Sequence, residues 1–234
     1  MQLDEALGLL RAKAAPNIRA IFQRHGAPDN VLGVKVGDLK VVLKEAGKDD
    51  ALARALWDSG VGDARYLAGL MIDPKKMDAA LIQRWADEAD WTMLSESTVP
   101  WVAAESPHGL ALARRWVDDP RPAVAAAGWA TWSCLVSMLP DAGLPLDELR
   151  ALLDRVATGV HHAPNRVRYC QNSFVISVGV YVAPLRDAAL AVADQIGPVH
   201  VDMGETACDV PLARPYVEKS LARGEPKTKK TVRC

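Results

Sequence analysis

The sequence has little of what sheet-rich or disulfide-stapled proteins need. Its 234 residues include only 2 Phe and 4 Tyr, and the 4 cysteines are scattered along the chain. Few such aromatics beside abundant Ala and Leu favour helices over strands. No two cysteines form a CxxC pair, so we predict neither a disulfide framework nor a zinc or thioredoxin-type site.

The chain also lacks a long apolar run and a strong excess of charge. No stretch approaches the roughly 18 apolar residues of a membrane span, and Asp4 and Glu5 stand where a signal peptide would be basic. We therefore expect a cytoplasmic protein without membrane contact. The net charge is −1, yet from Arg214 to Cys234 seven Lys or Arg face two Glu, a local balance of +5 that leaves −6 for the remainder. This excludes a globally basic nucleic-acid binder but not one basic edge.

What the sequence does contain is a recurring helical unit. Segments that open at Gly62, Pro122 and Asn165 each run from a turn into an apolar helix, and they lie 60 and 43 positions apart. The second interval is typical of two-helix HEAT or armadillo repeats. Such repeats bury their apolar faces by stacking and leave a concave surface for a large partner. The fold class predicted is therefore all-α, a solenoid of HEAT-like repeats.

The domain organisation follows from the short turns between helices. No linker is long enough to divide the chain, so we expect a single domain of about a dozen helices over residues 1–224. Residues 225–234 form a basic tail with almost no apolar side chain to bury, and we expect that tail to be flexible.

Tryptophan is concentrated in the middle of the chain. Six of the 7 Trp lie within residues 85–132. Core packing is the usual role of this residue, but an indole on the concave face can also stack on exposed bases. Trp91 is the best candidate for that second role because it stands at an irregular break rather than within an apolar stripe.

Several short segments suggest a family. GVKVGDLK at residues 33–40, LWDSGVGDARYLA at 56–68 and IDP at 72–74 resemble the DNA alkylation repair family of HEAT-like-repeat DNA glycosylases. The ending KKTVRC, preceded by VDMGETAC at 201–208, is similar to the ending of one branch of that family.

The resemblance implies a specific chemistry. Members remove N3- or N7-alkylated purines, whose positive charge already makes the base a good leaving group. A carboxylate stabilises the developing oxocarbenium sugar, aromatic residues contact the lesion nucleotide and an arginine holds the phosphate, without metal or cofactor.

This chain departs from the family pattern at those positions. The catalytic carboxylate position falls on Ser95 or, with a shift of one residue, on Glu96. Residues 124–129 have alanines where the family has a cation, and NSF at 172–174 replaces a later tryptophan. Glu96 remains the candidate catalytic residue, and its alternative role is a helix-capping or solvent-facing carboxylate.

Three functions stay open on this basis. The first is a monomeric DNA-binding protein that recognises damaged or distorted duplex DNA, alkylated or branched, through a basic concave face, and is nucleoid-associated when bound. The second is an alkylpurine DNA glycosylase that uses Glu96, and the third is a protein-binding scaffold. The residues expected to contact DNA, where each cation can otherwise be simply solvated, are Lys35, Lys40, Arg65, Trp91, Arg121, Arg166, Arg168, Lys229 and Lys230.

Overall fold

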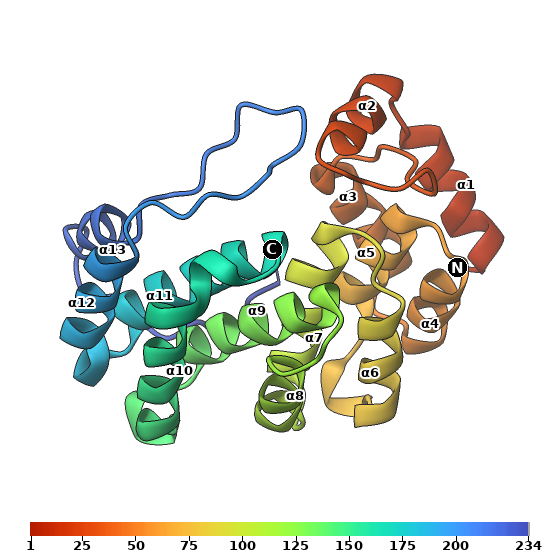
Figure 1. Cartoon of the computed structure of the whole chain (residues 1–234). Coiled ribbons are helices and arrows are strands. Elements are labelled where there is room, and N and C mark those ends of the chain that lie inside the picture. The colour runs from red at the N-terminus through yellow and green to blue at the C-terminus, as the bar shows by residue number, and fades with distance from the viewer. Residues whose placement is uncertain (234) are drawn as a thin grey trace.

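The computed structural model describes residues 1–233, and within this range every regular element is helical. Figure 1 shows the helices as a curved array, with the N-terminal helices at one end and α12 and α13 at the other. The α-helices are α1 (Leu3–Lys13), α2 (Pro16–Arg24), α3 (Val36–Ala46), α4 (Asp50–Asp58), α5 (Gly62–Met71), α6 (Ala79–Asp87), α7 (Val99–Glu105), α8 (Gly109–Trp116), α9 (Pro122–Met138), α10 (Leu146–Gly159), α11 (Asn165–Tyr181), α12 (Arg186–Ile196) and α13 (Ala213–Leu221).

Local signals account for many of the helix starts. Pro16 and Pro122 occupy the first position of α2 and α9, where the missing N–H costs nothing. Asp49 caps α4 by accepting hydrogen bonds from two backbone N–H groups, and Asp78 caps α6 through one. The all-α solenoid predicted from the sequence is confirmed.

The helices pair in sequence order, and the pairs stack. From α4 onward, the first helix of each pair packs against the second, and the second helices, α5, α7, α9, α11 and α13, pack on one another as an inner row. The α7 unit lies between α5 and α9, which explains why the first sequence interval was longer than one repeat. At Gly128 in α9 an added Cβ would lie 2.6 Å from the backbone N of Val117, so glycine permits the close approach to the end of α8.

All seven tryptophans are buried, and they are divided between two hydrophobic clusters that form the core. Trp57 and Trp85 stack with ring centroids 4.0 Å apart. Trp129 meets Phe174 edge-on at 5.3 Å and thereby joins α9 to α11. Packing between repeats is therefore the role of these side chains.

The acidic residue of the GDAR motif also has a structural role. Asp63, 1% exposed, accepts hydrogen bonds from the backbone N–H groups of Leu32 and Val34 at 2.5 and 2.7 Å. It therefore fixes the segment that leads into α3.

The segment after Gly224, which we expected to be a flexible tail, contacts the helices at several points. Glu225 pairs with Arg186 at 2.9 Å, and the N–H of Lys229 donates to Ser137 O at 2.8 Å. Arg233 donates to Ile72 O at 2.8 Å and pairs with Glu105 at 2.7 Å. Residues 225–233, hereafter the C-terminal strap, thus run along the C-terminal ends of α9, α7 and α5, where basic side chains complement the helix dipoles. Cys234, the last residue of the predicted tail, lies outside the described residues.

A long loop between α12 and α13 spans the two ends of the array. Residues 197–212 leave the C-terminal helices and extend toward α2 (Figure 1). At the loop tip the N–H of Glu205 donates to Arg24 O at 3.1 Å. Gly204 has φ +75, and a Cβ there would lie 2.1 Å from the same carbonyl oxygen, so this contact requires glycine.

Within residues 1–233 no single helix is long and apolar enough to cross a membrane. Taken together, α11 and the following segment Ala183–Ile196 are long and apolar enough to cross a membrane, but the pair is sharply bent at its break and qualifies by length and composition only.

Candidate nucleic-acid interface

The four arginines among the residues expected to contact DNA lie at the N-terminal ends of inner helices. Arg65 is in the first turn of α5, Arg121 directly precedes α9, and Arg166 and Arg168 are in the first turn of α11. Each is bound to partners within the protein, which limits what it can offer to a phosphate.

Arg65 is partly buried and makes several hydrogen bonds and ion pairs within the protein. Its side chain is 13% exposed and donates to Trp57 O at 3.2 Å and to Glu88 O at 2.9 Å. It also pairs with the carboxylate of Asp90 at 3.4 Å. Arg65 therefore joins the ends of α4 and α6 rather than standing free.

Arg121 and Arg168 differ in how far they are engaged. Arg121 is half-exposed and pairs with Asp119 at 2.7 Å and Asp87 at 2.9 Å, and its hydrogen bonds lower the pKa of Asp119. Arg168 donates to Ala163 O at 2.8 Å and His200 O at 3.1 Å. It thereby anchors the loop of residues 197–212 on the start of α11.

The lysines in the predicted set are freer. Lys35, Lys40 and Lys230 are exposed, and none forms an ion pair with any described residue. Lys229 is also exposed, and its ammonium group lies 5.3 Å from the centre of the Tyr181 ring. These side chains can reach a phosphate backbone without breaking an internal ion pair.

Trp91 does not lie where base stacking requires it. Its side chain is 3% exposed and packs against Phe22 with ring centroids 5.2 Å apart. The irregular break at residues 89–92 comes from a turn between helices, and the indole points into the core. Trp91 is therefore a packing residue.

Glu96 lies on a wide π-helical turn, Leu94–Thr98, that leads into α7. Its side chain is 8% exposed and forms a bidentate pair with Arg166, with Nε to Oε1 at 2.6 Å and Nη2 to Oε2 at 2.5 Å. Met203 of the long loop completes the cover, since Arg166 Nη1 lies 3.2 Å from its sulfur. The carboxylate thus neither caps a helix nor faces solvent.

The electrostatics of this pair limit its chemistry. Burial raises the pKa of Glu96, and the hydrogen bonds and charge of Arg166 oppose that rise. The bidentate arginine partner places a positive charge directly against the carboxylate and offsets the field of that carboxylate. Arg166, expected to bind phosphate, instead holds the carboxylate and stacks over the Tyr169 ring at 4.6 Å.

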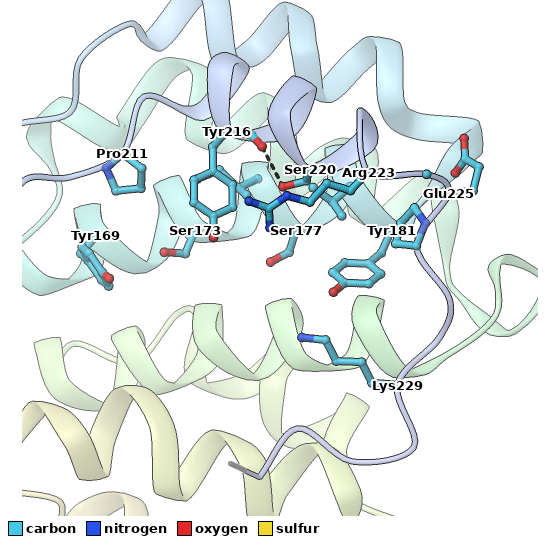
Figure 2. A pocket seen from close by; sticks show the side chains of 14 residues that line it. Tyr169, Ser173, Ser177, Tyr181, Pro211, Tyr216, Ser220, Arg223, Glu225 and Lys229 are labelled. Carbon is cyan, nitrogen blue, oxygen red and sulfur yellow. Dashed lines mark hydrogen bonds between the residues drawn. The ribbon is translucent and has the colours of Figure 1, made fainter. Parts of the chain in front are cut away.

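Sequence reasoning missed a polar cavity next to this pair. Tyr169, Ser173, Ser177 and Tyr181 recur every four residues on one face of α11 and line a cavity of about 640 Å³ together with α13 and the C-terminal strap. Figure 2 shows these four side chains along the helix, with Tyr216 and Arg223 above them and Lys229 below. A second cavity of about 220 Å³ shares these four residues and extends to Glu96. The four-residue spacing of hydroxyl side chains along α11 was the available signal.

The described residues contain no group of three or more His, Cys, Asp or Glu side chains that could hold a metal ion.

Comparisons with known proteins agree with this architecture. Residues 7–203 match the family model of the DNA alkylation repair enzymes. An uncharacterised protein of Listeria innocua is 32% identical over 228 residues, which cover 95% of this chain and 97% of the relative. An uncharacterised protein of Listeria monocytogenes is 33% identical over 228 residues with the same coverage.

A solved structure matches the whole fold. It superimposes with a TM-score of 0.91 at 28% identity and covers 100% of both chains. That protein is described as one of a family related to the HEAT-like repeat DNA glycosylases, with affinity for branched DNA structures. Together with the family match, these relationships show that the chain belongs to the DNA alkylation repair family.

Proposed function

We propose that the protein binds branched or distorted DNA and does not excise bases. Membership of the DNA alkylation repair family and the branched-DNA affinity described for the structural relative support the DNA partner. The observation that carries the noncatalytic part is the buried, bidentate pairing of Glu96 with Arg166.

The argument against excision is electrostatic. An oxocarbenium ion needs an unpaired negative charge aimed at the sugar. Here the only carboxylate at the expected position is 8% exposed and is neutralised by a guanidinium at 2.5 Å. The positive charge of Arg166, which lies 2.5 Å from the Glu96 carboxylate, opposes the approach of a second cation.

The argument for DNA binding rests on the freer cations. Lys35, Lys40 and Lys230 are exposed and unpaired within the described chain. Few such cations predict modest, salt-dependent affinity for plain duplex. A branched DNA brings several phosphate backbones together, so the curved array can contact more than one arm at once.

The test is a comparison of a fully paired three-way junction with a linear duplex of the same base composition. We expect the junction to bind about tenfold or more tightly at physiological salt, with affinity that falls as salt rises. The double variant Lys35→Gln/Lys40→Gln should weaken both complexes, whereas Arg65→Gln should act on stability. Equal affinity for the two DNAs would contradict branch recognition, and absence of DNA binding would favour the protein-scaffold alternative.

A further inference from the structure

The cavity of about 640 Å³ between α11, α13 and the C-terminal strap has an unusual polar lining. The hydroxyl groups of Ser173, Ser177 and Tyr181 have no hydrogen-bond partner within the described chain, although both serines are half-buried in a helix. Helical serines commonly satisfy themselves by bonding to a carbonyl one turn earlier, as Ser133 does with Trp129 O at 3.1 Å. These hydroxyls of α11 are reached by solvent in the cavity and are available to form hydrogen bonds with a polar molecule bound there.

The charge of the cavity favours an anion. Arg223 and Lys229 line it from opposite sides, and neither forms an ion pair with a described residue. The one carboxylate in the lining, Glu225, is already held by Arg186 through two hydrogen bonds of 2.9 Å. The uncompensated charge is thus positive.

Aromatic rings complete the lining. Tyr216 of α13 is 49% exposed, and Tyr181 at the end of α11 carries Lys229 over its face. In Figure 2 the Tyr216 ring and the Arg223 side chain lie over Ser173 and Ser177, with the Tyr181 ring nearer the strap. Flat, partly exposed rings beside cations and hydroxyls suit a ligand with a base, a sugar and a phosphate.

We propose that this cavity binds a single nucleoside monophosphate unit, with the phosphate between Arg223 and Lys229, the sugar on the α11 hydroxyls and the base on Tyr216. The unit has two sources, a free mononucleotide or an unpaired nucleotide at a DNA branch point. The second source rests on the proposed function and deepens it, because it assigns to the protein the unpaired part of a branched DNA.

The experiment uses the full-length protein and two probes. The first is a three-way junction with one unpaired 2-aminopurine nucleotide at the branch, compared with the fully paired junction. The second is free deoxyadenosine 5′-monophosphate, followed by NMR shifts of the tyrosine ring resonances. The variants are Tyr216→Ala and Arg223→Gln, both at exposed positions, and the control is Lys219→Gln, which removes one charge from α13 outside the cavity.

We expect the unpaired nucleotide to tighten binding about tenfold over the paired junction and to quench 2-aminopurine fluorescence. Both effects should vanish in Tyr216→Ala and Arg223→Gln and persist in Lys219→Gln. If only the free mononucleotide binds and the variants abolish that binding, the cavity assignment stands and its source is the free nucleotide.

The proposal fails if the paired junction binds well but the unpaired nucleotide and the mononucleotide add nothing, a result that leaves the proposed function intact. It also fails if the tenfold preference survives in both variants. Absence of binding by either DNA and by the mononucleotide would overturn both proposals.

Discussion

Replacing Arg166 with alanine should expose how strongly the Glu96 pair is built into the fold. Removal of one partner from a buried ion pair costs about 3–5 kcal/mol because the other charge stays buried without compensation. The Arg166 side chain is 26% exposed, so the lower end, about 3 kcal/mol, is the appropriate figure. For a chain of 234 residues this corresponds to a fall in Tm of about 6–12 °C.

The pH dependence gives the prediction a sign. Burial raises the pKa of Glu96 above its ordinary 4.5. Between pH 4.5 and that raised pKa the folded state binds more protons than the unfolded state, so the free energy of unfolding falls as pH rises. Arg166 opposes this rise in the pKa of Glu96, so its loss widens the pH range over which stability falls. Arg166→Ala should therefore lose stability more steeply than wild type above pH 4.5, and Glu96→Gln added to it should restore part of the loss at neutral pH.

The measurement is thermal and urea unfolding of each variant across this pH range, with Arg114→Ala as the control. Arg114 pairs with Glu148 at 2.7 Å, but both side chains are substantially exposed, 49% and 32%, and such surface pairs contribute at most about 1 kcal/mol. The reasoning is refuted if Arg166→Ala and Arg114→Ala lower Tm equally, or if the Arg166→Ala stability has the same pH profile as wild type.

Three further predictions follow from the placement of individual side chains. Arg233→Ala removes a guanidinium that binds the end of α5 and pairs with Glu105, so it should lower Tm by several degrees while the exposed Lys230→Ala leaves Tm unchanged; equal Tm values for the two variants would mean that the strap does not brace the fold. Trp91→Ala should destabilise the protein by about 3–5 kcal/mol in urea unfolding, and DNA affinity measured below the unfolding transition should remain near wild type; a selective loss of DNA affinity would restore a stacking role for Trp91. The double variant Lys35→Gln/Lys40→Gln should reduce the salt slope of DNA binding by about two phosphate contacts, and an unchanged slope would place the DNA elsewhere.

The helical architecture was readable from local signals, whereas the site was not. Pro122 and the turn before Asn165 mark inner-helix starts because their backbone preferences act within a few residues. The α7 unit was less visible, because its entry is a π-helical turn rather than a capped start.

The ion pairs and hydrogen bonds of individual side chains depend on partners that are distant in the sequence. Arg166 meets Glu96 from 70 positions away, and Arg233 meets Gly69 from 164 positions away, so neither pairing has a local pattern. Trp91 is buried because the fold brings Phe22 to it. The hydroxyl stripe on α11 was in the sequence, but its meaning required α13 and the strap to be placed opposite it.

Base release from alkylated DNA tests the central claim most directly. The measurement is liberation of 7-methylguanine and 3-methyladenine by pure wild-type protein, compared with the spontaneous rate and with Glu96→Gln. Because Arg166 already neutralises the carboxylate, wild type and Glu96→Gln should both match the spontaneous rate. Robust release by wild type that falls by about two orders of magnitude or more in Glu96→Gln would contradict the account and establish a glycosylase.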